Sequence, residues 1–126
     1  MNELECEVIG IQKEDQLCLI KLRHQGGIFG VMSLGDGFEP LQKVRIHFKE
    51  SDVMLARTSQ ISARNKFLSP ILSITHNSIM ARVVLGFLNE KIYSLVSLEA
   101  IRELGLEEGM ECFWFVKSNE IILRAL

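Results

Sequence analysis

The chain lacks a long apolar run, a basic N-terminal leader and any regular cysteine spacing. None of its 126 residues fall in a stretch approaching the roughly 20 apolar residues of a membrane-spanning helix. The acidic start, Met1–Glu5, has neither the basic nor the apolar region of a signal peptide. Cys6, Cys18 and Cys112 are widely spaced inside apolar segments. We therefore expect buried, reduced thiols in a cytoplasmic protein without membrane insertion.

An excess of positive charge is also missing, as are the common catalytic motifs. The net charge of −2 and the aromatic content of 7% argue against nucleic-acid binding, which needs a basic surface and exposed aromatic rings. There is no Cys-x-x-Cys, no His-x-x-x-His and no Gly-rich loop followed by Lys-Ser/Thr. The sequence therefore predicts a protein that is not an enzyme and that has no metal site built directly from side chains.

What the chain does contain is an internal repeat. Glu7–Ile11 parallels Pro70–Ile74, 63 positions later, and Lys49–Leu55 parallels Lys117–Leu123, 68 positions later. Each copy alternates apolar and polar residues in short segments separated by turn residues, which predicts about five strands. The fold class expected is all-β, with two tandem OB-like five-stranded barrels. The five extra residues of the second copy fall near 97–105, where the spacing predicts a short helix capped by Ser97 and ended by Gly105.

The repeat also predicts the division of the chain. We expect a first module over residues 1–57, a polar linker over 58–60 and a second module over 61–126. The run Cys112–Val116 has no alternation, so both of its faces should be covered. Two explanations remain open for this run: contact with another module or subunit, or the closure of its own barrel.

Candidate binding residues lie at both ends of the second module. Ser62, Ala63, Arg64 and Asn65 immediately precede its first strand, and Lys117 and Ser118 follow a late strand. Together they offer a guanidinium, an ammonium, hydroxyls and free backbone N–H groups, which suit an anion with two negative charges. Each also has an ordinary explanation, because Ser and Asn often cap turns and lysines at strand ends often extend into water.

The Ile-Ser-Ala-Arg-Asn run with a later Lys-Ser resembles the molybdate- and tungstate-binding domains called molbindin, Mop or TOBE domains. The resemblance implies that Ser62, Ala63, Arg64, Asn65, Lys117 and Ser118 bind the oxyanion, and that Ser97 assists them at the end of the third strand. The first copy keeps only Lys49 and Ser51 and has Glu50 in the place of Ser118, so we expect either a weak second site there or a purely structural module.

This resemblance implies a cytoplasmic protein for storage, homeostasis or sensing of molybdate or tungstate, bound as the intact oxyanion at module or subunit interfaces. It further implies a homo-oligomer, a trimer or a dimer, in which Arg64 of one subunit faces Lys117 of another. The alternative is an accessory domain of a molybdate ABC transporter or a transcription regulator, with weak or no ligand binding.

Overall fold

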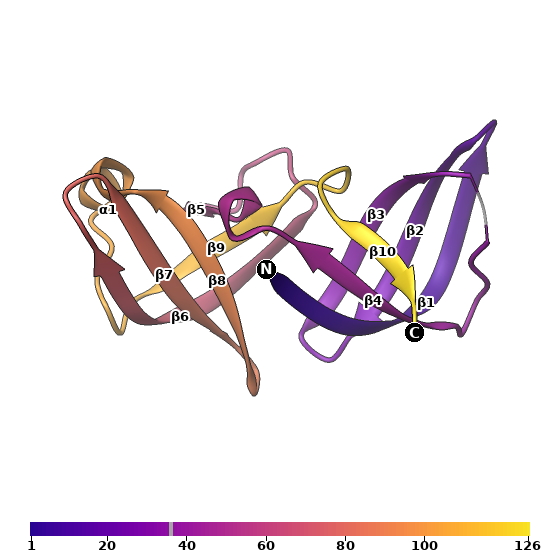
Figure 1. Ribbon diagram of the computed structural model, residues 1–126, viewed down its shortest axis with the longest axis horizontal. Coiled ribbons are helices and arrows are strands. Elements are labelled where there is room, and N and C mark those ends of the chain that lie inside the picture. Colours follow the sequence, from indigo (N-terminus) through magenta and orange to yellow (C-terminus); the bar gives the residue numbers. More distant parts are fainter. Residues whose placement is uncertain (36) are drawn as a thin grey trace.

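Two curled five-stranded antiparallel sheets lie end to end in the computed structural model, which describes residues 1–35 and 37–126 (Figure 1). The first half of the chain forms β1 (Asn2–Glu14), β2 (Leu17–His24), β3 (Gly27–Leu34), β4 (Lys43–Phe48), the 3-10 turn η1 (Glu50–Asp52) and β5 (Met54–Ala56). The second half forms β6 (Asn65–His76), β7 (Met80–Phe87), β8 (Glu90–Ser97), α1 (Leu98–Leu104), β9 (Glu111–Val116) and β10 (Ile122–Ala125). The expected all-β class with one short helix is confirmed.

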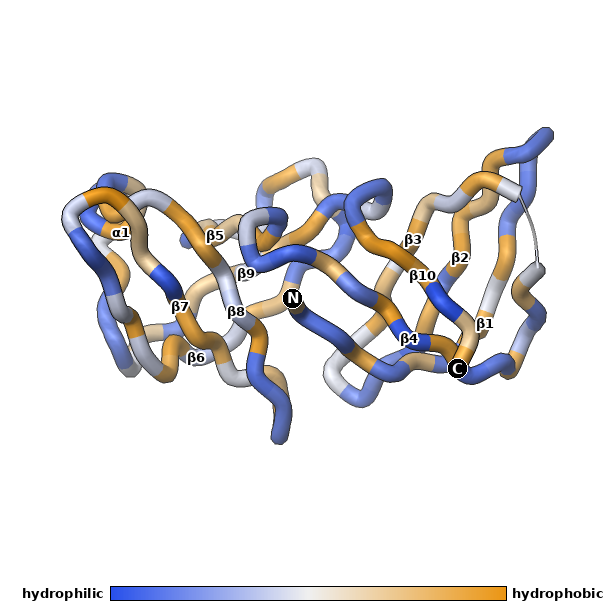
Figure 2. Tube along the Cα trace, in the orientation of Figure 1, coloured by the Kyte–Doolittle hydropathy of each residue, from blue (hydrophilic) through white to orange (hydrophobic). Residues whose placement is uncertain are grey.

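Alternation of apolar and polar residues creates the strands and their buried faces. In β1, Leu4, Cys6 and Val8 are buried while Glu3 and Glu5 are exposed. Successive side chains of a strand point to opposite faces, so this pattern places one face in the core and the other in water. Figure 2 shows the same division along the chain, with hydrophilic residues concentrated in several of the turns.

The two halves repeat each other in structural detail. β1 carries a bulge between Val8 and Gly10, and β6 carries one between Ile71 and Ser73, 63 positions later. The second half differs chiefly by the insertion of α1. Ser97 caps this helix by accepting a hydrogen bond from the backbone N–H of Ala100 at 3.0 Å, and Gly105 ends it with a left-handed φ of 64°. Both were predicted from the sequence.

Each sheet takes one strand from the other half of the chain. The strand orders are β10-β4-β1-β2-β3 and β5-β9-β6-β7-β8. The sheets therefore cross the expected boundary at residues 58–60 twice, and neither 1–57 nor 61–126 contains a complete sheet. The physical reason is that β5 and β10 are short edge strands, and their pattern does not distinguish between the equivalent edges of two similar sheets. The buried residues Val53 and Ile121 precede the exchanged strands at matching positions.

An aromatic cluster fills the junction between the halves. Trp114 of β9 is fully buried, and its ring lies 6.1 Å from that of Phe48 and 6.3 Å from that of Phe29, both of the first half. Its indole N–H donates to the Ser69 hydroxyl at 3.0 Å. Of the two explanations for the run Cys112–Val116, contact with the other module is the one observed. No helix in the described ranges has the length and apolarity needed to cross a membrane.

Candidate oxyanion site

Asn65, the first residue of β6, joins the two halves of the chain. Its side chain is fully buried, accepts a hydrogen bond from the Gly30 N–H at 2.7 Å, and donates to the carbonyls of Gly30 and Val116 at 3.0 Å each. The expectation that this side chain binds a ligand is therefore not supported by its surroundings, because its donors and acceptor are already used. The sequence does not distinguish an asparagine that binds a ligand from one that holds the backbone in place, because both can stand next to Ser and Arg.

The segment before Asn65 presents its cation at the surface. Ala63 is buried and anchors the segment, whereas Ser62 and Arg64 are exposed. The Arg64 guanidinium donates to the carbonyls of Ile61 and Ser62. In the described part of the chain, the backbone N–H groups of Ser62, Ala63 and Arg64 form no hydrogen bond. Several donors are thus available to a ligand here.

Lys117 and Ser118 lie beside this segment within the same chain. Asn65 pairs with Val116 in the antiparallel ladder of β6 and β9, so continuing the register by one residue places Arg64 opposite Lys117. The turn is held in place because the Met32 N–H donates to the Ser118 carbonyl and the Glu120 N–H to the Lys117 carbonyl, each at 3.0 Å. The family resemblance implied that Arg64 and Lys117 meet from different subunits. The structure brings them to one end of one sheet.

A third cation comes from the first half of the chain and was not found from the sequence. A Cβ atom placed on Gly30 would lie 3.5 Å from the Lys21 ammonium and 3.8 Å from the Ser118 hydroxyl. Gly30 pairs with Lys21 between β3 and β2, and its missing side chain lets the Lys21 ammonium and the Ser118 hydroxyl lie close to the strand. We use the name open corner for Lys21 and Ser118 beside Gly30, together with Arg64 and Lys117 at the adjoining ends of β6 and β9. Lys21 could not be identified from the sequence, because an exposed lysine in a strand looks like any other surface lysine.

The cations of the open corner are not neutralised by carboxylates. Among the described residues, Arg64, Lys117 and Lys21 form no ion pair within 4.0 Å. The nearest acidic influence is Glu120, whose pKa is raised by burial and by the neighbouring Asp52 carboxyl, and lowered in part by Lys117. Three cations with hydroxyl and backbone donors make this corner suitable for an anion.

Ser97 lies in a different environment. Its hydroxyl caps α1. Its strand, β8, contacts the turn after β4 and not the turn after β9 that carries Ser118: the Ser94 hydroxyl in β8 donates to the Val53 carbonyl at 2.6 Å. Because the strands are exchanged, the third strand beside Ser118 is β3 of the first half. The role of Ser97 in ligand binding stays a prediction, and the contacts seen for it are those of a helix cap.

The equivalent corner of the first copy is occupied by its own side chains. Glu50 stands where the second copy has Ser118, and its carboxylate accepts two hydrogen bonds from Arg82, from Nε at 2.8 Å and from Nη2 at 3.2 Å. The Arg82 guanidinium lies 4.3 Å from the centre of the Tyr93 ring, which takes the place of Gly30. We call Lys49, Glu50, Arg82 and Tyr93 the filled corner. Lys49 and Ser51, the residues expected to form a weak second site, are both exposed.

Comparison with known proteins assigns the family. The model of the TOBE domain matches residues 61–123. The chain belongs to the TOBE domain family. Molybdenum-pterin-binding protein 1 of Clostridium pasteurianum is 36% identical to this chain over 66 residues, which are 52% of this chain and 97% of the relative. A probable molybdenum-pterin-binding protein of Haemophilus influenzae is 34% identical over 65 residues, which are 51% of this chain and 94% of the relative.

A solved structure extends the likeness to the whole chain. The molybdate-bound crystal structure of the cytoplasmic molybdate-binding protein ModG superposes with a TM-score of 0.92, at 22% sequence identity, and covers 99% of this chain and 96% of that one. The single-module relatives match half of this chain, whereas ModG matches all of it. The likeness to ModG shows that the same fold, two five-stranded sheets, extends over both halves of this chain.

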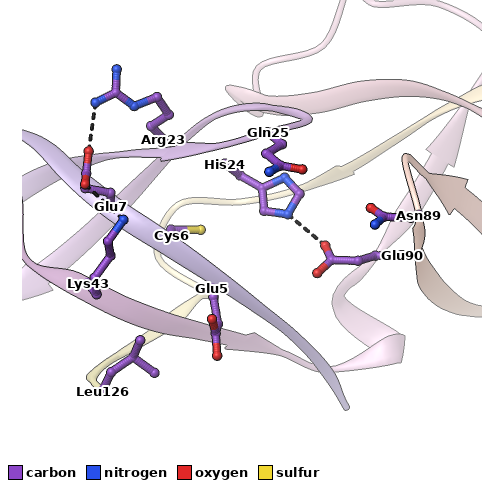
Figure 3. Close-up of a pocket in the computed structure, with 10 residues that line it drawn as sticks. All are labelled: Glu5, Cys6, Glu7, Arg23, His24, Gln25, Lys43, Asn89, Glu90 and Leu126. Atoms are coloured by element: carbon purple, nitrogen blue, oxygen red, sulfur yellow. Dashed lines mark hydrogen bonds and ion pairs between the residues drawn. The ribbon is translucent and has the colours of Figure 1, made fainter.

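A cleft of ≈ 770 Å³ lies elsewhere in this TOBE protein, between β1, β2 and the turn that joins β7 to β8 (Figure 3). Its cations are already paired: the Glu7 carboxylate binds Arg23 at 2.8 Å and Lys43 at 3.1 Å. These contacts lower the pKa of Glu7, with the Arg23 hydrogen bond as the largest cause. The cleft is lined by three carboxylates, Glu5, Glu7 and Glu90, and only two cations, so it does not attract an oxyanion.

The same cleft contains a thiol and an imidazole whose environments do not favour catalysis. Burial, with a smaller contribution from the charge of Glu90, raises the pKa of Cys6 to about 12, so the thiol is protonated and a poor nucleophile at neutral pH. His24 accepts from the Gly26 N–H through Nδ1 at 2.8 Å, so Nε2 carries the proton and donates to Glu90 at 2.7 Å. No cluster of His, Cys, Asp and Glu in the described part of the chain is arranged to hold a metal ion.

Proposed function

We propose that this TOBE protein binds molybdate or tungstate, as the intact oxyanion, at the open corner. The observation that carries the proposal is a set of three cations at one end of the molecule: Lys21 lies beside Gly30 and Ser118, and Arg64 and Lys117 follow from the ladder register at the adjoining strand ends. None of the three has an ion-pair partner among the described residues. The similarity to molybdenum-pterin-binding proteins and to ModG supports this choice of ligand. The protein is proposed to act without catalysis.

The donor set favours an anion that carries no proton. Phosphate near neutral pH keeps a proton, so a phosphate site benefits from an acceptor such as a carboxylate. The open corner offers hydroxyl, ammonium, guanidinium and backbone N–H groups, most of which can only donate. Molybdate, tungstate and sulfate are fully ionised and fit this set. The preference for the two larger anions rests on the family.

Binding at this corner requires Arg64 to turn. Its guanidinium now donates to the nearby carbonyls of Ile61 and Ser62, and an anion with two charges is a stronger acceptor than a neutral carbonyl. Arg64 and Lys117 belong to the second half of the chain, whereas Lys21 belongs to the first. A bound anion would therefore connect the two halves, and it would stabilise the folded protein by about 2.7 kcal/mol at 100 times the Kd.

The biological role proposed is cytoplasmic storage, homeostasis or sensing of the oxyanion. Because the open corner lies at the surface, a neighbouring subunit of a homo-oligomer, a trimer or a dimer, could cover it and complete the ligand shell. Ligand would then favour assembly, since anything that binds only the assembled form stabilises it. Association with molybdate ABC transporter components is the second possibility for this family.

Calorimetric titration with molybdate, tungstate, sulfate and phosphate tests the proposal. We expect micromolar or tighter binding of the first two. The substitutions Lys117→Ala, Arg64→Ala and Lys21→Ala each remove a charge-assisted hydrogen bond and should weaken binding by roughly 10- to 100-fold.

Lys91→Ala is the matched control, because Lys91 is an exposed lysine of β8 outside both corners. It should leave the affinity unchanged. Loss of affinity in the control to the same extent as in Lys117→Ala would indicate attraction by overall charge and not a site. No heat with any of the four anions would favour the accessory domain. Sedimentation velocity with and without molybdate would then measure whether ligand promotes assembly.

A further inference from the structure

Internal pseudo-symmetry relates part of the open corner to the filled corner, whereas Lys21 corresponds to Val84, and Arg82 to Leu19. Asn65 and Asn2 occupy equivalent positions: Asn2 bonds both the N–H and the carbonyl of Tyr93, as Asn65 does for Gly30. The turn after β4 likewise matches the turn after β9, so Lys49 corresponds to Lys117 and Glu50 to Ser118. Two sites of one ancestral kind can therefore be compared within a single chain.

The differences between the two corners all concern charge and space. The open corner has Ser118, which brings no carboxylate to its cations, and Gly30, whose missing side chain lets the Lys21 ammonium and the Ser118 hydroxyl lie close to the strand. The filled corner has Glu50 and Tyr93. The Glu50 carboxylate meets the Arg82 guanidinium through two hydrogen bonds, and Arg82 stacks on the Tyr93 ring.

The Glu50 carboxylate has the contacts that a bound anion would have. A carboxylate presents two oxygens to the planar guanidinium fork, as an oxyanion does. The N-terminal ammonium also lies 3.7 Å from it. The hydrogen bond from Arg82 is the largest cause of the lowered pKa of Glu50, so this carboxylate stays ionised at neutral pH.

We infer that the filled corner is an oxyanion site occupied by the protein's own Glu50 carboxylate, and that it is closed to free molybdate or tungstate while this carboxylate is present. The inference rests on the proposed binding at the open corner. An anion attached to the chain has an effective concentration of roughly millimolar or more. A free oxyanion at micromolar concentration does not displace it.

The consequence is one ligand site per chain where the repeat alone suggests two. The filled corner joins the halves without ligand, through Glu50 of the first half and Arg82 of the second. At the open corner the halves are joined without ligand through Asn65 and the Ser118 carbonyl, but the cations of the two halves would be connected only by an external anion. Ligand binding at the open corner would then add a second charged connection between the halves, beside the permanent one between Glu50 and Arg82.

Substitution of Glu50 by the residue of the second copy tests the inference. We expect Glu50→Ser, alone or with Tyr93→Gly, to bind one more molybdate per chain than the unsubstituted protein in equilibrium dialysis. Removal of the carboxylate frees Arg82, which together with the exposed Lys49 offers two positive charges to the dianion. Adding Arg82→Met should abolish the extra site, and adding Lys117→Ala should weaken only the original one.

The matched control is Glu7→Ser, which also removes one carboxylate that binds an arginine but lies outside both corners. It should not change the stoichiometry. Glu50→Gln, which keeps the shape of the side chain, provides a second variant, and circular dichroism confirms that each variant is folded. Equal stoichiometry in the unsubstituted protein and in all the folded Glu50 variants would overturn the inference. This outcome differs from a failure of the proposed function, in which the unsubstituted protein itself would bind no molybdate.

Discussion

Two asparagines show how single residues hold the halves of this chain together. Asn65 and Asn2 are each the first residue of a long strand, and each is buried with its amide bonded to the backbone of the other half. Buried amides need such partners, because an unsatisfied buried donor or acceptor is costly. The sequence motif suggested that Asn65 binds the ligand. Its contacts indicate that it positions Arg64, the neighbouring residue.

Replacement of Asn65 should therefore reduce stability more than it changes ligand chemistry. Asn65→Ala leaves the N–H and carbonyl of Gly30 and the carbonyl of Val116 without their partner. We expect a loss of roughly 2–4 kcal/mol in the free energy of unfolding, measured by urea denaturation. Asn2→Ala, which loses two hydrogen bonds, serves as the comparison and should cost less. An unfolding midpoint for Asn65→Ala equal to that of the unsubstituted protein would contradict this account.

At the scale of elements, the hairpin between β2 and β3 packs closely against the second half. A Cβ atom on Gly26 would lie 2.3 Å from the Phe87 ring, so the absence of a side chain permits this contact. The Phe87 ring is itself fixed, because it stacks on His24 at 5.0 Å and meets Trp114 edge-on at 5.2 Å. The close contact between this hairpin and Phe87 of the second half thus requires glycine at position 26.

Gly26→Ala should weaken the junction. The added methyl group must displace a ring that is held on two sides, and such overpacking costs about 1–3 kcal/mol. Unfolding in urea would measure the loss. Gly10→Ala is the control, because its Cβ would meet no atom closer than 3.8 Å. A junction that tolerates Gly26→Ala as well as Gly10→Ala would mean that Phe87 has room to move.

At the scale of the whole molecule, the two turns after β4 and β9 meet near the pseudo-symmetry axis. Asp52 and Glu120 occupy matching positions of these turns, and their carboxyl groups face each other. Burial, followed by the hydrogen bond and charge of Asp52, raises the pKa of Glu120, while Lys117 partly opposes the shift. Two like charges therefore meet where the exchanged strands begin.

This contact predicts a pH-dependent difference between the protein and Glu120→Gln. The folded state binds the Glu120 proton more tightly than the unfolded chain, whose pKa is near 4.5. The stabilisation from this proton is present below pH 4.5 and is lost as the pH rises through the folded-state value. At pH 7 we expect a higher Tm for Glu120→Gln than for the unsubstituted protein, and the gain should vanish towards pH 4.

Thermal melts across this pH range provide the measurement, and Glu103→Gln, on an exposed part of α1, is the control. A constant difference in Tm at every pH would show that Asp52 and Glu120 do not interact. Because Lys117 belongs to the open corner, molybdate should also shift this profile, since an added dianion competes for the same cation.

The strands, their buried faces, the repeat, the capped helix and the cationic motifs were predictable from residues close together in the chain. Period-two alternation shows which face of β1 or β4 is buried, and Ser97 with Gly105 bounds α1 wherever the helix lies. Folding in three dimensions was needed to show that β5 and β10 exchange sheets, that Lys21 lies beside Ser118, and that Glu50 binds Arg82 in the second corner. These depend on contacts between distant segments, and local patterns do not record which of two equivalent partners a short strand or a charged side chain will meet.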